Sequence, residues 1–437
     1  MSSKEIFVYE NWSSPSPKWL GTLYVSSLRG KETYSFEFSK SFLSTDPPFF
    51  LDPALSFFPG RQYASDGFLF GAFSDACPDR WGRTLMKRRE ALAARQQQRK
   101  PAALYESDYL LGVFDLGRMG ALRFAQSFNG PFLASGDAYA IPPWETLRAL
   151  EQAARQIEDP AMSLTEDREA LSLLLAPGSS LGGARPKATV EAPDHTLWIA
   201  KFPAKQDEYD VGLWEMTAHD LAALVELDVP EARLCTFSSN GSTFLVKRFD
   251  RAKNHRIHFA SAMTLLGKVD GSSEEVSYPQ LADLILTHGA KPETDIRELF
   301  ARVAFSIAVS NTDDHLRNHG FLLDAESGAW RLSPLFDVNP SLANRQYLSL
   351  ALDDGNYEAS FETLGRTAPL YCIEESEARA IIERIDDTVK THWRNAADEA
   401  GISRGEIKLM EACFSAPSLR PLRKDGAGRC NDIDETQ

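Results

Sequence analysis

One stretch constrains the fold and chemistry of this chain more than any other, namely residues 311–318 with the sequence NTDDHLRN. Asp313 is followed by Asn318 five residues later, and Asp337 comes further along in the motif LFD. ATP-dependent phosphotransferases place a catalytic base and two magnesium-binding groups in this order. The pattern therefore predicts a kinase in which Asp313 is the base and Asn318 and Asp337 bind the metal.

The residues on either side predict the elements that carry this site. Between residues 295 and 310, apolar side chains recur with the spacing of one helix face, at Ile296, Leu299, Phe300, Val303 and Ile307. Residues 320–323 and 330–332 predict the two strands of a hairpin. A helix that ends just before the acidic residues would place Asp313 in a short loop, where its carboxylate can be aimed at a substrate hydroxyl.

Residues 188–202 predict the nucleotide side of the site. Two strands, over 188–190 and 197–202, are separated by a turn, and Lys201 lies at the end of the second. A lysine in this position would pair the α- and β-phosphates of ATP. Glu215, on a helix predicted over residues 211–225, would hold that lysine in place.

The loop before these strands, residues 177–187 with the sequence PGSSLGGARPK, is a weaker signal. Gly182, Gly183 and Ala184 are small enough for their backbone amides to approach phosphate, and Lys187 ends the loop. The loop matches neither G-x-G-x-x-G nor G-x-x-x-x-G-K-[ST]. Taken alone, it is better explained by a flexible surface turn.

The acidic residues also have simpler interpretations. A single loop aspartate is usually a helix cap or part of a solvated turn, and Asp314 competes with Asp313 for the role of base. His315 and His319 lie four residues apart and on a helix could share a zinc ion. The glutamate of H-E-x-x-H is missing and Gly320 would end such a helix, which argues against a zinc hydrolase. The ordered set of base, asparagine, second aspartate and strand-end lysine favours the kinase.

Length and charge set the wider limits. A chain of 437 residues exceeds what one core usually holds, which predicts two or three domains. The formal net charge of −15 argues against a surface that binds nucleic acid without specificity. Five scattered cysteines predict no disulfide framework, and no apolar run approaches the roughly 20 residues that span a bilayer. We therefore expect a soluble cytoplasmic protein without a membrane partner.

Over nearly its whole length the chain resembles the HipA family of bacterial serine/threonine kinases, the toxin halves of HipA–HipB toxin–antitoxin pairs. The motifs that carry the resemblance are FGAFSD (70–75), PDRWGR (78–83), GALRF (120–124), GGARPK (182–187), AKF (200–202), KRFDR (247–251), NTDDHLRN (311–318) and LSPLFD (332–337). Two departures are Asp314, where the family usually has glycine, and residues 257–261, which lack the acidic pair of the best-known members.

The resemblance implies an α+β fold with two protein-kinase-like lobes. The nucleotide lobe is expected to be β-rich and the C-terminal lobe all-α, and a β-rich subdomain precedes them. The expected boundaries are 1–130 for the N-terminal subdomain, 131–255 for the nucleotide-binding lobe, 256–415 for the helical catalytic lobe and 416–437 for a mobile tail. ATP and Mg²⁺ are the expected cofactors.

Matched position by position, the resemblance gives the site residues their roles. Asp313, rather than Asp314, resembles the catalytic aspartate. The other matched residues are Asn318 and Asp337 as metal ligands, Lys201 as the ATP lysine, and the backbone of Lys247, Arg248 and Phe249 as the adenine hinge.

The resemblance also implies regulation and partners. Ser180, and equally its neighbour Ser179, resembles in placement the serine that such kinases autophosphorylate. A phosphate there adds about two negative charges beside the ATP phosphates, which would inhibit the enzyme. The implied partners are a protein substrate of translation, such as an aminoacyl-tRNA synthetase, and a HipB-like antitoxin, through which alone DNA would be contacted.

The leading hypothesis is therefore an ATP- and Mg²⁺-dependent serine/threonine protein kinase that acts as a growth-inhibiting toxin. A second hypothesis is a non-catalytic relative that uses the same cleft to sense nucleotide or to hold an antitoxin. ATP binding without phosphate transfer would favour this second hypothesis. A third is phosphorylation of a small molecule or lipid, which only a substrate screen separates from the first.

Overall fold

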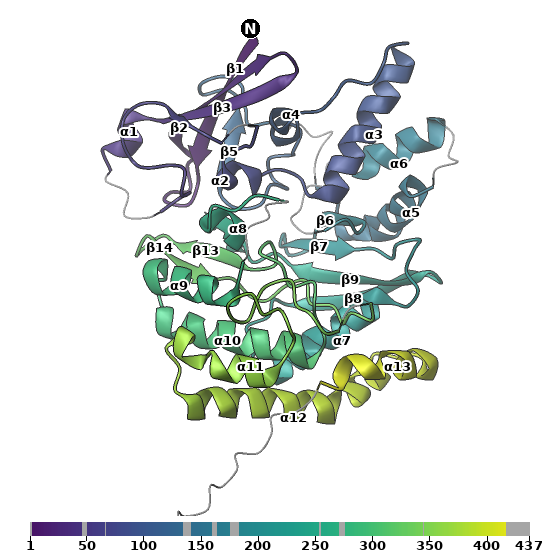
Figure 1. The fold of residues 1–437 in the computed structure, drawn as a ribbon. Helices are drawn as coiled ribbons and strands as arrows, with labels where there is room; N and C mark the ends of the chain where they lie inside the picture. The colour runs from purple at the N-terminus through teal and green to yellow at the C-terminus, as the bar shows by residue number, and fades with distance from the viewer. Residues whose placement is uncertain are drawn as a thin grey trace, which may run out of the picture.

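Residues with alternating apolar and polar side chains at the N-terminus pair into one antiparallel sheet (Figure 1). The computed structural model describes residues 2–45, 50–65, 67–133, 141–159, 164–174, 183–252, 255–270, 276–343 and 345–416. The strand order is β4-β3-β2-β1-β5, with β1 Ser2–Glu10, β2 Lys18–Leu28, β3 Lys31–Phe38, β4 Gln62–Tyr63 and β5 Leu122–Ala125. The sheet packs on the FGAFSD segment, where the ring centroids of Phe36 and Phe73 lie 5.1 Å apart. The expected β-rich N-terminal subdomain is confirmed.

The helices near this sheet are α1 Lys40–Leu43, α2 Gly71–Ser74, α3 Arg80–Gln96 and α4 Glu106–Leu111. Helix α3 begins at Arg80 because the Asp79 side chain accepts a hydrogen bond from the Gly82 N–H (2.8 Å) and so caps the first turn. The apolar residues Trp81 and Leu85 of α3 pack into the core of the second sheet, described next. Helix α3 accordingly lies beside α6 and points away from the body of the molecule (Figure 1).

The second sheet carries the lysine that is predicted to face ATP. Its antiparallel strands lie in the order β6-β7-β9-β8, with β6 Lys187–Glu191, β7 Leu197–Lys201, β8 Ala232–Ser238 and β9 Gly241–Lys247. The helices of this lobe are η2 Trp144–Thr146, α5 Leu147–Ile157, α6 Leu164–Leu174 and α7 Val211–Leu224. Asp210 caps α7 by accepting a hydrogen bond from the Leu213 N–H (3.1 Å), which starts the helix shortly before Glu215.

The C-terminal lobe is built mainly of helices. They are α8 Ala262–Leu265, α9 Tyr278–His288, α10 Pro292–Ala308, α11 Phe361–Arg366, η3 Ala368–Tyr371, α12 Glu375–Glu399, α13 Arg404–Met410 and η4 Glu411–Phe414. The predicted stripe of α10 is confirmed as core, since Leu299, Phe300 and Val303 are each 0% exposed. None of the described helices is both long and apolar enough to cross a bilayer.

One detail of the expected all-α lobe is corrected. The lobe contains a sheet of β12 Phe259–Ser261, β13 Gly320–Asp324 and β14 Ala329–Leu332, in that order. The hairpin predicted over residues 320–332 gains a third strand because residues 259–261 pair with β13. Ser261 then ends the strand by capping α8, through a hydrogen bond from the Thr264 N–H to its side chain (3.2 Å).

A buried ion network fastens the N-terminal subdomain to the segment after β9. Asp250, which is 0% exposed, accepts hydrogen bonds from Arg248 (2.7 Å), Arg251 (2.6 Å) and the Gly120 N–H (2.8 Å). Arg248 also donates to the carbonyl oxygen of Gly117 (2.7 Å). Burial alone would raise the pKa of Asp250, but the two guanidinium groups hold it well below its usual range. The carboxylate therefore stays charged and joins the two parts of the chain. The two residue pairs β10 Arg251–Ala252 and β11 His255–Arg256 form a short ribbon beside it.

Candidate active site

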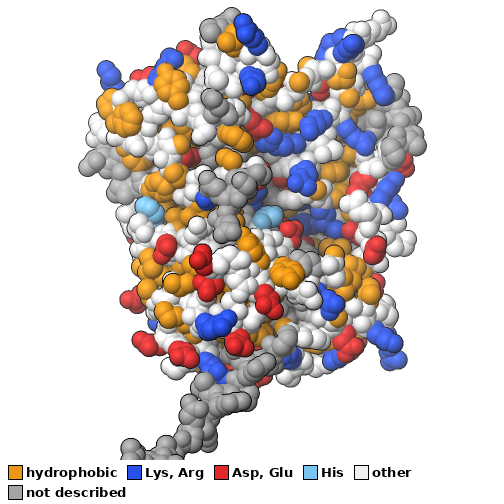
Figure 2. All heavy atoms as spheres, viewed as in Figure 1, with side chains coloured by type: hydrophobic (Ala, Val, Ile, Leu, Met, Phe, Trp, Pro, Cys, Tyr) orange, Lys and Arg blue, Asp and Glu red, His pale blue; other side chains and the backbone are white. Residues whose placement is uncertain are grey.

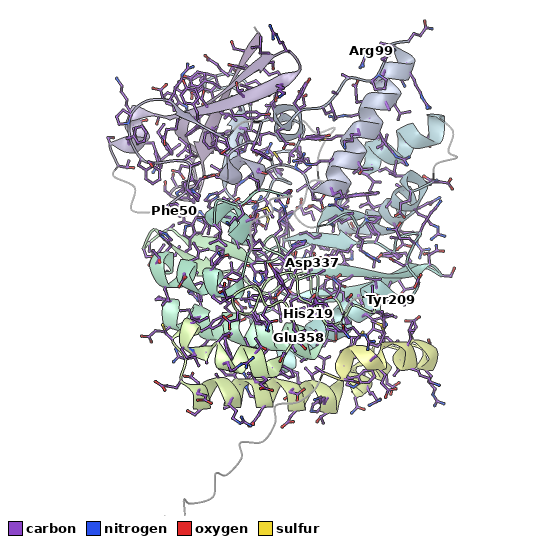
Figure 3. All side chains as sticks on the ribbon, in the orientation of Figure 1. Phe50, Arg99, Tyr209, His219, Asp337 and Glu358 are labelled. Carbon is purple, nitrogen blue, oxygen red and sulfur yellow. The ribbon has the colours of Figure 1, made fainter. Side chains whose placement is uncertain are left out.

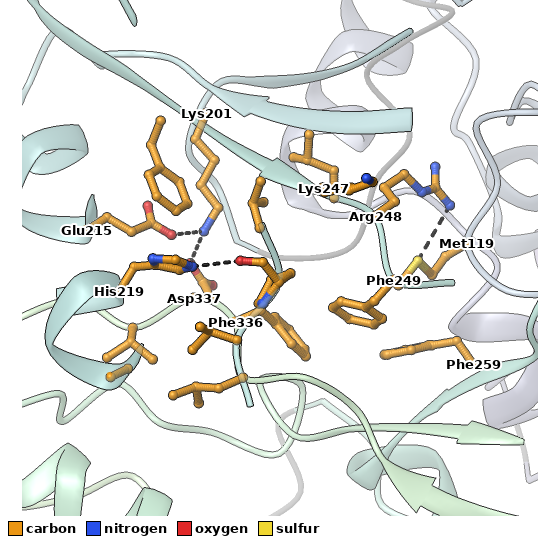
Figure 4. A pocket seen from close by; sticks show the side chains of 18 residues that line it. Met119, Lys201, Glu215, His219, Lys247, Arg248, Phe249, Phe259, Phe336 and Asp337 are labelled. Atoms are coloured by element: carbon orange, nitrogen blue, oxygen red, sulfur yellow. Dashed lines mark hydrogen bonds and ion pairs between the residues drawn. The ribbon is translucent and has the colours of Figure 1, made fainter. Parts of the chain in front are cut away.

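Lys201 lies between the carboxylates of Glu215 and Asp337 (Figure 4). Its Nζ is 2.5 Å from Glu215 Oε1 and 2.5 Å from Asp337 Oδ1. Burial alone would lower the pKa of Lys201, but Asp337 and Glu215 together raise it above its ordinary value. The structure thus brings together a strand-end lysine, a helix glutamate and a loop aspartate. The contact of Lys201 with Glu215 was expected from the sequence, whereas the contact of Lys201 with Asp337 was not. Figure 3 shows Asp337 near the middle of the molecule, far from Arg99, which follows the end of α3.

Asp337 is held ionised and in an uncommon backbone conformation. Burial would raise the pKa of its carboxyl group, but Lys201, Lys187 and His315 together lower that pKa to about 2. Its φ angle of 59° lies in the left-handed region, which residues other than glycine adopt mainly at strained or functional positions. An ionised carboxylate held in this way suits a divalent cation or a phosphate-bound metal.

Lys187 is placed beside Lys201 but has a different partner. The two lysines stand directly opposite each other on β6 and β7. Lys187 is buried, and its Nζ lies 2.8 Å from Asp79 Oδ2 and 3.4 Å from the carbonyl oxygen of Gly183. Burial raises the pKa of Asp79, and Lys187 opposes that shift. The role of Asp79 was missed in the sequence, although its position in the PDRWGR motif was the available signal.

The other side of the site is the loop of residues 311–318. Asn318 donates from Nδ2 to the carbonyl oxygen of Asp313 (3.1 Å), and its N–H donates to the carbonyl oxygen of His315 (2.8 Å). The Asn318 side-chain oxygen is buried and has no hydrogen-bond donor among the described residues, and the same holds for Asn339 Oδ1. Buried acceptor oxygens are normally satisfied, so these two atoms are available as oxygen ligands for a cation.

Asp313 is exposed at the edge of a wide cleft, whereas Asp337 lies further in. The cleft has a volume of about 840 Å³ and lies between the N-terminal subdomain and the helical lobe. Arg80, Gly183, Ala184 and Arg317 line it together with Asp313. A protein segment could therefore reach Asp313 from solvent, which is the access that a base acting on a substrate hydroxyl needs.

Asp314 faces away from the cleft into the core of the helical lobe. Its Oδ2 accepts a hydrogen bond from the Tyr278 hydroxyl (2.9 Å), and its Oδ1 lies 3.1 Å from His319 Nε2. Burial would raise the pKa of Asp314, but His319 and Tyr278 lower it below its ordinary value. Of the two adjacent aspartates, only Asp313 is open to a substrate. His319 therefore contacts Asp314 in the core. Among the described residues, no group of three or more His, Cys, Asp and Glu side chains could hold a metal.

We expect the adjacent aspartates to respond oppositely to removal of the side chain. Asp314→Ala should lower the free energy of unfolding by about 2–3 kcal/mol, because it leaves buried polar groups of Tyr278 and His319 without their partner. Asp313→Ala should change that free energy by less than about 0.5 kcal/mol, because the side chain is exposed. Urea denaturation followed by circular dichroism measures both, and equal stability of the two variants would contradict the assignment.

The apolar part of the site is a narrow slot beneath β7 and β9. Aromatic and aliphatic side chains line it, namely Met119, Ile199, Phe244, Val246, Phe249, Phe259 and Phe336. The ring centroids of Phe249 and Phe336 are 5.5 Å apart. The cavity volume of the slot is about 60 Å³, against about 840 Å³ for the cleft at Asp313.

The segment after β9 borders this slot. The N–H groups of Lys247 and Arg248 already donate to the carbonyl oxygens of Glu231 (2.8 Å) and Leu197 (2.9 Å). Of the three residues expected to form the adenine hinge, only Phe249 has a backbone N–H without an acceptor among the described residues. The Arg248 side chain points to the N-terminal subdomain instead of the slot interior (Figure 4). Gly182, Ser179 and Ser180 lie outside the described residues.

Three comparisons relate the chain to known proteins. Residues 179–393 match the HipA-like C-terminal domain family. The chain is 32% identical over 149 residues to a Haemophilus influenzae protein described as "Putative kinase", and 26% identical over 155 residues to "Putative kinase Y4dM" of Sinorhizobium fredii. These alignments cover 30% and 32% of this chain but only 43% and 36% of the two curated relatives.

A solved structure shares the fold over almost the whole chain. It is a chain of the complex of HipA, HipB and operator DNA from Shewanella oneidensis MR-1, with a TM-score of 0.65 and 17% sequence identity. The superposition covers 94% of this chain and 95% of that one. The expected kinase-like fold with an added N-terminal subdomain is therefore confirmed.

Proposed function

We propose that this chain, whose residues 179–393 match the HipA-like C-terminal domain family, is an ATP- and Mg²⁺-dependent serine/threonine protein kinase. The observation that carries the proposal is the position of Lys201, 2.5 Å from both Glu215 and Asp337. Protein kinases need this lysine–glutamate pair and a metal-binding aspartate in place together.

The site residues divide the work of phosphoryl transfer. The slot beside Phe249 would receive the adenine, and Lys201 would pair the α- and β-phosphates. Asn318 and Asp337 would hold Mg²⁺, which when bound neutralises charge on the phosphates. Asp313 would orient the substrate hydroxyl and accept its proton while the hydroxyl oxygen bonds the γ-phosphorus. The bond from that phosphorus to the bridging oxygen breaks, so the products are a phosphoester and ADP.

The partners and the regulation belong to the same proposal. The solved relative is a complex with HipB and operator DNA, which supports a HipB-like antitoxin as a partner and DNA contact only through it. We propose a cytoplasmic protein of translation, such as an aminoacyl-tRNA synthetase, as the substrate. Autophosphorylation of Ser179 or Ser180, in the segment just before Gly183, would place negative charge next to the ATP phosphates and inhibit the enzyme.

The test is phosphosite mass spectrometry after incubation with Mg²⁺ and ATP, with and without bacterial extract. We expect phosphate on Ser179 or Ser180 and on extract proteins, and a loss of about 10²-fold in the Asp313→Ala variant. Calorimetry with ATP runs in parallel, because Asp313→Ala should still bind the nucleotide. ATP binding by the wild-type protein without any transfer would refute the kinase and favour a nucleotide-sensing protein.

A further inference from the structure

Helix α3 carries a row of cations on its exposed face. Arg80, Lys87 and Arg95 recur at positions i, i+7 and i+15, with Thr84 and Ala91 between them. At 3.6 residues per turn these five residues share one narrow face of the helix, and all but Ala91, which is half-buried, are exposed. We call Arg80, Lys87 and Arg95 the cationic stripe. It is about 22 Å long, from 15 residues at 1.5 Å each.

The stripe has no internal counterions. No described carboxylate pairs with Arg80, Lys87 or Arg95, whereas Arg83 pairs with Glu106 (2.6 Å) and Arg99 pairs with Glu90. Residues 80–100 contain eight Lys and Arg residues and one Glu, in a chain whose net charge is −15. Unpaired positive charge concentrated on one helix of an acidic protein marks a place where an acidic partner is attracted instead of repelled.

The stripe starts at the proposed catalytic cleft. Arg80 lines the cleft of about 840 Å³ that also holds Asp313. Figure 2 shows Lys and Arg side chains gathered over α3 and at the edge of the hollow beneath it. A protein segment with its hydroxyl at Asp313 would therefore meet Arg80 as it leaves the cleft, and then Lys87 and Arg95.

We propose that the cationic stripe docks an acidic segment of the protein substrate, adjacent in sequence to the residue that is phosphorylated. This inference rests on the proposed kinase function. The cations are spaced by about 10 Å and 12 Å along the helix, close to the rise of three or four residues of an extended peptide. Acidic side chains at that interval can each meet one cation.

The same features favour a peptide over a nucleic acid. The large aromatic of α3, Trp81, is buried, so the stripe offers no platform for stacking bases. Three unpaired cations neutralise at most about three phosphates, so counterion release would contribute little to nucleic-acid affinity. The net charge of −15 would repel a long polyanion from the rest of the surface.

The direct test is binding of a fluorescein-labelled 16-residue peptide of Asp, Glu and Gly with one Ser, measured by anisotropy on the full chain. The comparison probe replaces every Asp and Glu by Asn and Gln. We expect the acidic peptide to bind more tightly, and the triple variant R80Q/K87Q/R95Q to weaken its binding by about tenfold, more at low salt than at high salt.

The matched control removes three equally exposed charges from the N-terminal sheet and its neighbouring helix, in the variant R29Q/K31Q/K40Q. Its peptide affinity should equal that of the wild type. Equal losses in both triple variants would show a response to net charge alone and would overturn the proposal. So would tighter binding of a 20-nucleotide single-stranded RNA than of the acidic peptide, which would make the stripe a nucleic-acid surface.

A kinetic arm separates this proposal from the kinase proposal itself. With the acidic peptide as acceptor, R80Q/K87Q/R95Q should raise KM for the peptide about tenfold and leave KM for ATP unchanged. Peptide binding that depends on the stripe without any phosphate transfer would sink the kinase function but keep the docking surface. Phosphate transfer with a peptide KM that is the same in R80Q/K87Q/R95Q and the wild type would keep the kinase function and refute the docking surface.

Discussion

Asp337→Asn is expected to reduce phosphoryl transfer by about 10³-fold, the range found when one preorganised electrostatic group is removed from an active site. Asparagine keeps the shape of the side chain but removes the charge, which the wild-type residue carries throughout the physiological range because its pKa is about 2. Lys201 keeps its contact with Glu215, so the fold of the second sheet and of α7 should stay intact. Phosphate incorporation from labelled ATP measures the effect.

A control variant shows whether the loss of transfer comes from the position of Asp337 or from the loss of any one carboxylate. Asp387→Asn on α12 removes an exposed carboxylate and should leave transfer unchanged. Calorimetry with ATP should show that Asp337→Asn weakens the dependence of nucleotide affinity on Mg²⁺ concentration. Full activity of Asp337→Asn would exclude the proposed metal-binding role of this residue.

Asp250→Ala is expected to lower the free energy of unfolding by about 3–5 kcal/mol, the usual result of breaking a buried ion pair from one side. The change leaves the buried Arg248 and the partly buried Arg251 without their shared carboxylate, and it removes the acceptor for the Gly120 N–H. Urea denaturation at pH 7 measures the loss, with Asp387→Ala as the exposed control. A loss below 1 kcal/mol would show that this joint is not a stabilising contact.

The pH dependence of this stabilisation follows from the direction of the pKa shift. The folded pKa of Asp250 lies below the unfolded value of about 3.9. Its contribution is therefore complete above that value and is lost as the pH falls through the folded pKa. The difference in unfolding free energy between the wild type and Asp250→Asn should stay constant from pH 7 to about pH 5 and shrink below about pH 4.

The sequence was most informative where local pattern and chemistry coincide. The stripe of α10, the hairpin over residues 320–332 and the strand that ends at Lys201 follow from apolar periodicity, and the structure confirms them. Glu215 could be placed near Lys201 because kinases pair the strand lysine with a glutamate on the following helix. These predictions depend on residues that are close to one another in the sequence.

The parts that could not be predicted depend on contacts between distant segments. Asp79 meets Lys187 across 108 residues, and no periodicity links them. The residue pattern alone did not show which of Asp313 and Asp314 is the base. In the structure the Tyr278 hydroxyl lies 2.9 Å from Asp314 and holds it in the core, a contact between segments 36 residues apart. Burial of a charged residue is set by the packing of the whole lobe, so local sequence does not reveal it.

Asp79 uses its two oxygens for two different tasks. Oδ1 caps the first turn of α3, and Oδ2 holds Lys187, which also reaches the carbonyl oxygen of Gly183. A ligand that draws Lys187 away from Asp79 leaves an unpaired carboxylate at the N-terminus of α3, the helix that carries Arg80. Thermodynamic linkage makes such an effect reciprocal. If an acidic segment bound to α3 changes the affinity for the nucleotide by some factor, the bound nucleotide changes the affinity for that segment by the same factor.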